Sequence, residues 1–209
     1  MTRKPKTLTI YFTMTYVPNN IRGVLFDMDG TLTVPNIDWK DLRARVRVPE
    51  GVGIMEHIYS LSEEEARQAD DIVRDIEMAS VRDAVANDGL IELFAELEAQ
   101  PWRLALITNN HREAMEHVVT TFGLRFDLLL SREDAPLKPA PDLLLLALEK
   151  FAISREEAVF VGDGRYDRDA SAAAGVRYIH LEHDRDRPPE GDVIYRLDEL
   201  LDRLESAPD

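Results

Sequence analysis

The chain has 209 residues, of which 44% are hydrophobic, and this composition predicts a folded protein of ordinary size with a substantial core. Its 25 Lys and Arg residues against 40 Asp and Glu residues give a formal net charge of −15, which argues against partners such as nucleic acid or anionic membranes. It contains no cysteine, so disulfides and thiolate zinc sites are excluded, and its oxygen-rich side chains suit a hard cation such as Mg²⁺.

We expect residues 1–20 to form an N-terminal extension. They begin with basic residues, but Thr9, Thr13 and Thr15 interrupt the apolar stretch, and no small-residue cleavage site follows, so a secretory signal is disfavoured. An extra edge strand, a loose extension and a true start at Met14 remain open alternatives. No run reaches the roughly 18 apolar residues of a membrane helix, and we expect a cytoplasmic protein.

Short, continuous apolar runs alternate with helical patterns along most of the chain. Continuous runs are typical of parallel strands that are buried on both faces. The expected strands are residues 23–26, 104–108, 126–130, 158–161 and 178–181. The expected helices are residues 113–122, 140–151, 167–174 and 197–204. This alternation predicts an α/β fold with a doubly wound, Rossmann-like parallel sheet.

Residues 33–88 break this alternation, because they carry helical patterns and no convincing strand. Within them, residues 62–85 predict one long amphipathic helix that opens with a capping-box pattern. An insert after the first strand would lie where open α/β sheets bind ligands. We therefore interpret residues 33–88 as a small all-helical lid, and residues 21–32 with 89–209 as the core domain. A helical layer that only packs on the sheet is the alternative.

Two aspartates, Asp27 and Asp29, follow the first expected strand directly. Side chains two positions apart in a strand start on one face, and burying two like charges so close together requires a counter-charge. Gly30 allows the chain to bend there. One carboxylate can attack phosphorus while the other protonates the leaving oxygen and then activates water. The alternative is an ordinary Asp-Gly turn at a strand end.

Three later segments could supply donors and counter-charges at the same edge of the sheet. Thr108 and Asn109 end the second strand with a hydroxyl and amide groups, which suit a phosphoryl oxygen, although Thr108 could simply cap a helix. Lys138 precedes a proline, which favours an extended and fixed backbone, although most lone lysines lie on the surface. The fourth expected strand leads into Asp163 and Asp167, which add carboxylate oxygens, although Asp167 could instead cap the helix there.

In this order, the motifs resemble those of the haloacid dehalogenase superfamily, on its phosphoglycolate phosphatase-like branch with a small helical cap. The motifs are DMDGT at residues 27–31, LITN at 106–109, KPAPD at 138–142 and GDGRYD at 162–167. The resemblance extends over residues 22–204. It implies a Mg²⁺-dependent phosphatase that forms an aspartyl-phosphate on a small phosphomonoester.

The resemblance also implies a role for each matched residue. Asp27 would be the nucleophile and Asp29 the general acid and base, while Thr108 and Lys138 would complete the catalytic set. Thr108, Asn109 and Lys138 would hold the substrate phosphate. The metal ligands would be Asp27, the backbone carbonyl of Asp29, Asp163 and, directly or through water, Asp167.

Two departures limit what the resemblance carries over. Asp27 and Thr108 are 81 positions apart, fewer than in relatives with a full helical cap, so substrate contacts of larger caps do not transfer. Gly164 also stands where the family commonly has Ser or Thr.

Three other functions remain open from the sequence. A sugar phosphomutase could use the same phospho-aspartate. A 2-haloacid dehalogenase would leave Asp29, Asp163 and Asp167 without a purpose. A non-catalytic binding protein on this scaffold would usually have lost a catalytic residue, and none is missing. The substrate and the oligomeric state are not determined by the sequence.

Overall fold

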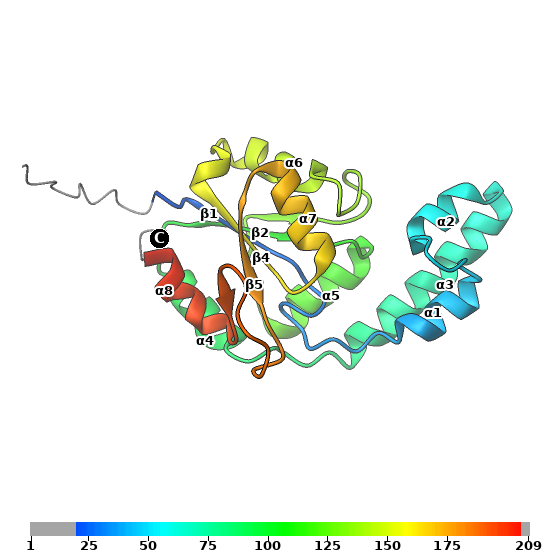
Figure 1. Cartoon of the computed structure of the whole chain (residues 1–209), viewed down its shortest axis with the longest axis horizontal. Coiled ribbons are helices and arrows are strands. Elements are labelled where there is room, and N and C mark those ends of the chain that lie inside the picture. The colour runs from blue at the N-terminus through cyan, green and yellow to red at the C-terminus, as the bar shows by residue number, and fades with distance from the viewer. Residues whose placement is uncertain (1–19, 206–209) are drawn as a thin grey trace, which may run out of the picture.

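A six-stranded parallel sheet forms the centre of the computed structural model, which describes residues 20–205 (Figure 1). Its strand order is β3-β2-β1-β4-β5-β6, and every neighbouring pair is parallel. The strands are β1 (Gly23–Phe26), β2 (Arg103–Ile107), β3 (Leu128–Leu130), β4 (Ala158–Gly162), β5 (Arg177–Leu181) and β6 (Val193–Ile194). The predicted α/β fold with a doubly wound sheet is confirmed.

Side chains alternate between the two faces of the sheet along each strand, so both faces carry apolar residues. Helices cover both of these faces. Val24 and Phe26 of β1 pack with apolar residues of α4, α5 and α8 on one face. Leu25 packs with those of α6 and α7 on the other. These helices are α4 (Leu90–Leu97), α5 (Arg112–Phe122), α6 (Asp142–Phe151), α7 (Arg165–Ala174) and α8 (Leu200–Glu205). Two 3₁₀ turns, η1 (Arg155–Glu157) and η2 (Leu197–Glu199), precede β4 and α8.

The position of β1 determines where a ligand can bind. β1 lies between β2 and β4, and the chain continues to β2 on one side and reaches β4 on the other. The strand order therefore reverses at β1, and such a switch point opens a crevice at the carboxyl ends of the strands. Asp27 and Asp29 follow β1 at this crevice.

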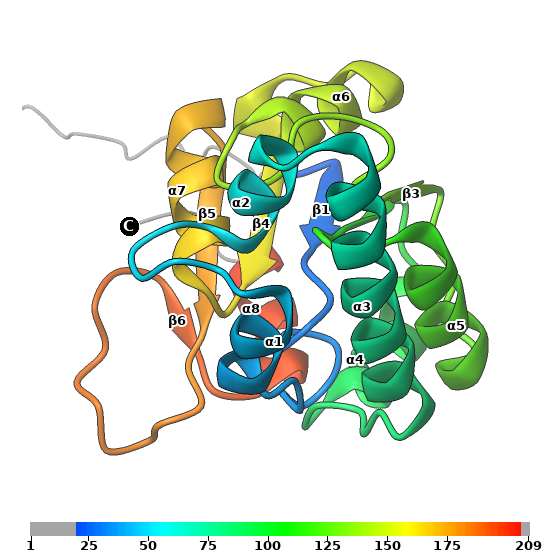
Figure 2. The same cartoon turned by 90° about the vertical axis from the view of Figure 1, so that its right-hand side faces the viewer.

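Helices α1 (Trp39–Val46), α2 (Ile54–Ser60) and α3 (Glu63–Arg82) are inserted between β1 and α4. They project from one end of the core in Figure 1 and lie in front of β1 and β4 in Figure 2. A small apolar cluster of their own, with Leu42, Val46, Ile58 and Val73 among its members, holds them together. We refer to residues 33–88 as the lid.

The long helix α3 belongs to both parts of the molecule. Its middle residues, including Ala69 and Val73, pack inside the lid, whereas Met78 and Val81 near its end pack with the main core. The division into lid residues 33–88 and core residues 21–32 with 89–209 remains a prediction.

Some sequence predictions differ from the structure at their edges. The helix predicted from residue 140 begins at Asp142, because a residue that precedes a proline, here Ala140 before Pro141, disfavours helical geometry. The strand β6 was not predicted, since two residues give no periodic pattern. The predicted N-terminal extension lies outside the described residues except for Asn20.

Candidate active site

Asp27 and Asp29 lie where the chain leaves β1 and turns back. The backbone N–H of Asp27 still donates to the carbonyl of Val161 in β4 at 2.9 Å, so this residue continues the strand. Gly30 has φ +83°, and a β-carbon there would lie 2.1 Å from Oδ2 of Asp163. Glycine is therefore required both by the backbone conformation and by the close approach of Asp163. The turn brings Asp163 beside the segment that carries Asp27 and Asp29.

Lys138 provides a buried positive charge within this group. Its Nζ atom donates to Oδ1 of Asp27 at 2.5 Å, to Oδ1 of Asp167 at 2.7 Å and to the carbonyl of Ile107 at 3.1 Å. The carboxamide of Asn109 fixes the backbone of Lys138, since it donates to the Lys138 carbonyl at 2.8 Å and accepts from its N–H at 3.0 Å. The Lys138 ammonium thus bridges the carboxylate of Asp27, which follows β1, and that of Asp167, in the first turn of α7.

Asp163 and Asp167 follow β4. Asp167 is buried in the first turn of α7, where its Oδ2 accepts from the N–H of Gly164 at 3.0 Å. Oxygen atoms of Asp27, Asp163 and Asp167 all lie within 4.8 Å of one another. Three converging carboxylates balanced by one lysine leave excess negative charge, and oxygen donors of this kind fit a hard divalent cation. The residues present therefore fit Mg²⁺.

The end of β2 adds hydrogen-bonding groups to the same region. Thr108 is buried, and its Oγ1 accepts from the N–H of Asn110 at 3.1 Å. A hydroxyl that accepts one hydrogen bond can still donate its proton to a second group. Because the Asn109 carboxamide binds the backbone of Lys138, its observed contact is to the protein; contact with a substrate phosphate remains a prediction.

The pKa values of these groups reflect burial and crowding of like charges. Burial raises the pKa of Asp29 to about 7; the Glu77 carboxylate adds to the rise, and Asn110 and Lys138 partly offset it. Burial and Asp167 also raise the pKa of Asp27 well above its ordinary value, against the opposing effect of Lys138. Burial opposes the charge of Lys138, but Asp167 and Asp27 together raise its pKa.

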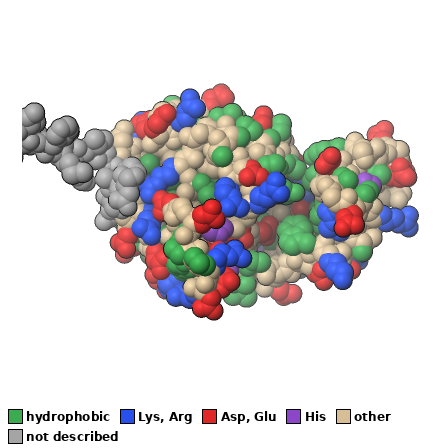
Figure 3. Space-filling view, in the orientation of Figure 1, with side chains coloured by type: hydrophobic (Ala, Val, Ile, Leu, Met, Phe, Trp, Pro, Cys, Tyr) green, Lys and Arg blue, Asp and Glu red, His purple; other side chains and the backbone are tan. Residues whose placement is uncertain are grey.

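The predicted site residues line one cleft of about 490 Å³ between the core and the lid. The structure brings all seven together there: Asp27, Asp29, Thr108, Asn109, Lys138, Asp163 and Asp167. The lid contributes Trp39 among others, and the core contributes Tyr166. Both aromatic side chains are about half exposed, at 54% and 52%. The surface in Figure 3 is visibly hollowed between the core and the lid.

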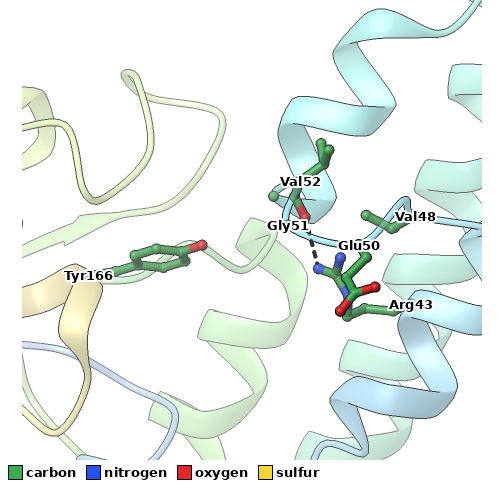
Figure 4. Close-up of a pocket in the computed structure, with 7 residues that line it drawn as sticks. Arg43, Val48, Glu50, Gly51, Val52 and Tyr166 are labelled. Atoms are coloured by element: carbon green, nitrogen blue, oxygen red, sulfur yellow. Dashed lines mark hydrogen bonds between the residues drawn. The ribbon is translucent and has the colours of Figure 1, made fainter.

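Tyr166 also lines a second hollow, of about 470 Å³, that opens toward the lid loop at residues 48–53. Figure 4 shows its ring facing this loop across the gap. Arg43 holds the loop in place, since its guanidinium donates to the carbonyls of Val52 at 2.9 Å and Pro49 at 2.7 Å. The two hollows thus meet at Tyr166.

Three residues near the cluster were not singled out from the sequence. The Nδ2 atom of Asn87 donates to the carbonyls of Gly30, Thr31 and Thr33 at 2.8, 2.9 and 3.2 Å, so it fixes the turn after Asp29. Thr31 donates to Oδ2 of Asp27 at 3.2 Å. Nε2 of His183 lies 3.6 Å from Oδ2 of Asp163, and this contact raises the pKa of His183. Only Thr31, the last residue of DMDGT, had a local sequence signal.

Comparison with known proteins identifies the family. The model of the family described as "Haloacid dehalogenase-like hydrolase" matches residues 34–181. A haloacid dehalogenase-like hydrolase domain-containing protein of Arabidopsis thaliana is 34% identical over 164 residues, which are 73% of this chain and 67% of that protein. This chain therefore belongs to the haloacid dehalogenase-like hydrolase family, and the predicted membership is confirmed.

One further relative and one solved structure are also similar to this chain. Phosphoglycolate phosphatase 1 of Pseudomonas aeruginosa is 28% identical over 218 residues, covering 89% of this chain and 79% of that protein. The crystal structure of a hydrolase from Pseudomonas syringae has a TM-score of 0.72 at 21% identity, covering 88% of this chain and 97% of that one. The latter similarity concerns the fold alone.

Within residues 20–205, no helix is both long enough and apolar enough to cross a bilayer.

Proposed function

We propose that this hydrolase is a Mg²⁺-dependent phosphatase that hydrolyses a small phosphomonoester through an aspartyl-phosphate on Asp27. The observation that carries this proposal is the contact of one buried lysine, Lys138, with both Asp27 and Asp167, next to Asp163 in the same cleft. A phosphate dianion needs positive charge and hydrogen-bond donors at such a site, and the relative named phosphoglycolate phosphatase 1 has a compatible activity.

In the first step, a carboxylate oxygen of Asp27 attacks phosphorus, and the bond from phosphorus to the leaving oxygen breaks. Asp29 gives its proton to that leaving oxygen. In the second step, Asp29 takes a proton from water, which attacks the phosphorus of phospho-Asp27; inorganic phosphate leaves and the Asp27 carboxylate is restored. A pKa of about 7 suits both tasks of Asp29, because neither protonation state is costly near neutral pH.

The other polar residues would hold the phosphoryl group. Lys138 fixes Asp27 through its Oδ1 and Thr31 does so through Oδ2, so the carboxylate is oriented from both sides. Thr108 and the backbone amides that follow it would donate to phosphoryl oxygens. Asp27, Asp163 and Asp167, with the carbonyl of Asp29, would hold Mg²⁺, which when bound supplies positive charge to offset the carboxylates and the phosphate.

We further propose that the leaving group lies against Trp39 and Tyr166 at the mouth of the cleft. Exposed aromatic rings gain from contact with a flat or apolar group, and these two rings come from opposite sides, one from the lid and one from the core. The second hollow beyond Tyr166 leaves room for leaving groups larger than glycolate.

Asp27→Asn tests the proposed function directly. With p-nitrophenyl phosphate and Mg²⁺, we expect wild-type protein to release phosphate and the variant to lose on the order of 10⁴-fold in kcat, as happens when a nucleophile is removed from other hydrolases. Asp75→Asn, on the exposed face of α3, is the matched control and should keep wild-type kcat. Wild-type turnover in Asp27→Asn would refute the assignment. Release of free phosphate from glucose 1-phosphate, rather than its conversion to another sugar phosphate, would exclude a phosphomutase.

A further inference from the structure

A second cluster of buried charged side chains lies at the junction of the lid and the core. Its centre is Glu77, which is buried on the lid helix α3 although it is ionisable. In Figure 2, α3 runs beside α5 of the core, and residues of the two helices are in contact. Buried carboxylates need partners, so the contacts of Glu77 indicate what it is there to do.

Both oxygens of Glu77 are occupied by core residues. Oε1 accepts from Nη1 of Arg132 at 2.9 Å. Oε2 accepts from the backbone N–H of His111 at 3.1 Å and also contacts Nδ1 of the same residue. The side chains of Glu77, His111 and Arg132 are at most 8% exposed. Nη2 of Arg132 also donates to Oδ1 of Asp70, which lies on α3 as well, at 2.9 Å.

These contacts converge on the loop that carries Thr108. His111 is the N-cap residue of α5 and follows Asn110 directly. The backbone N–H of Arg132 donates to the carbonyl of Asn110 at 3.1 Å. Glu77 therefore holds this loop twice, once through the backbone of His111 and once through Arg132. Its charge also contributes to the raised pKa of Asp29.

We infer that Glu77 is a positioning residue: from the lid, it sets the loop of residues 108–110 in the conformation that binds the substrate phosphate. This inference rests on the proposed function. A helix that only needed to pack on α5 would not require a buried carboxylate, because replacing a buried ion pair with apolar residues is often neutral or stabilising. The hydrogen bond to the backbone of His111 instead fixes one particular geometry for the loop.

The test compares Glu77→Gln with Arg74→Gln. The control variant removes the exposed ion pair between Arg74 of α3 and Glu113 of α5, a contact between the same two helices that does not involve the loop. For each protein we would measure kcat and KM with p-nitrophenyl phosphate, the inhibition constant of inorganic phosphate, thermal stability, and hydrogen exchange of the amides in residues 105–115.

In Glu77→Gln, we expect the inhibition constant of phosphate to rise about tenfold, the loss that corresponds to one charge-assisted hydrogen bond. The amides of Asn110 and His111 should exchange faster. Arg74→Gln should keep both properties within about twofold of wild type, the small effect typical of an exposed ion pair. A folded Glu77→Gln protein with wild-type phosphate inhibition and wild-type exchange would overturn the inference.

A second variant covers the case in which Glu77→Gln does not fold. Replacing Glu77 and Arg132 together with Gln removes both charges of the pair, so neither is left buried alone. The same loss of phosphate affinity and faster exchange are expected in it, and their absence would overturn the inference. If no ester is hydrolysed by wild-type protein, the proposed function fails, while the exchange measurement still decides whether Glu77 orders the loop.

Discussion

Lys138 and Asp27 form a buried ion pair, with 2.5 Å between Nζ and Oδ1, although they are 111 positions apart in the chain. Asp167 completes the contact from a third segment at 2.7 Å. The arrangement joins the ends of β1 and β4 and the loop before α6, so this one lysine both compensates the acidic cluster and fixes its geometry.

Lys138→Met should destabilise the protein as well as inactivate it. Removing the ammonium leaves Asp27 and Asp167 buried without their main partner, and breaking a buried pair in this way costs about 3–5 kcal/mol. Urea unfolding in EDTA should show this loss, whereas Lys150→Met, on the exposed side of α6, should change stability little. Adding Asp167→Asn to Lys138→Met should recover part of the loss; strictly additive effects would contradict the proposed coupling.

Asp29→Asn should change how stability depends on pH. The folded-state pKa of about 7 lies above the ordinary 3.8, so the folded protein holds this proton more tightly than the unfolded chain does. The stabilisation that comes from this tighter proton binding to Asp29 is complete below pH 3.8 and is lost as the pH rises through about 7. In EDTA, the free energy of unfolding of wild type should therefore fall relative to Asp29→Asn between these pH values, by a few kcal/mol at most, on the order expected from such a shift. Parallel stability curves would show that Asp29 titrates normally.

Mg²⁺ should stabilise the protein and restore activity after treatment with EDTA. Binding to the folded state alone contributes about 2.7 kcal/mol when the free ion is at 100 times its Kd, which is a clear rise in Tm. Asp163→Asn should reduce this rise strongly, because it removes one of the three converging carboxylates. A Tm that does not respond to Mg²⁺ in wild type would argue against a metal at this position.

Tyr166→Ala should act on substrate choice rather than on the chemical step. We expect kcat/KM for aryl phosphates to fall by about tenfold, the scale of losing one aromatic contact together with its buried area, while small aliphatic phosphate esters lose less. Tyr59→Ala is the control, because Tyr59 is an exposed tyrosine on the lid helix α2 that lines neither hollow. Equal losses for both classes of ester would indicate that Tyr166 does not contact the leaving group.

The sequence predicted the sheet and the gathering of the site because both depend on local signals. Continuous apolar runs identify buried parallel strands, and polar residues that directly follow such strands must meet at one edge of the sheet. Asp27, Thr108 and Asp163 all have this position, so their shared location followed from the order of the elements. The four motifs also identified the family.

Other contacts could not be predicted because they join segments with no pattern in common. The helical spacing places Glu77 on the same face of α3 as Val73 and Val81, but nothing in the sequence identifies Arg132 and His111 as the partners of its carboxylate. His183 reaches Asp163 from the loop after β5, and Asn87 reaches the turn at Gly30 from the end of the lid. Each of these depends on tertiary packing, which a one-dimensional pattern does not encode.

Because α3 contributes Met78 and Val81 to the main core and Val73 to the lid cluster, the lid is not an interchangeable module. Excising residues 33–88, or grafting another cap in their place, would also remove apolar surface on which α5 rests. Chimeras that exchange caps within this family should therefore be joined within α3, upstream of Glu77, if the recipient scaffold is to stay intact.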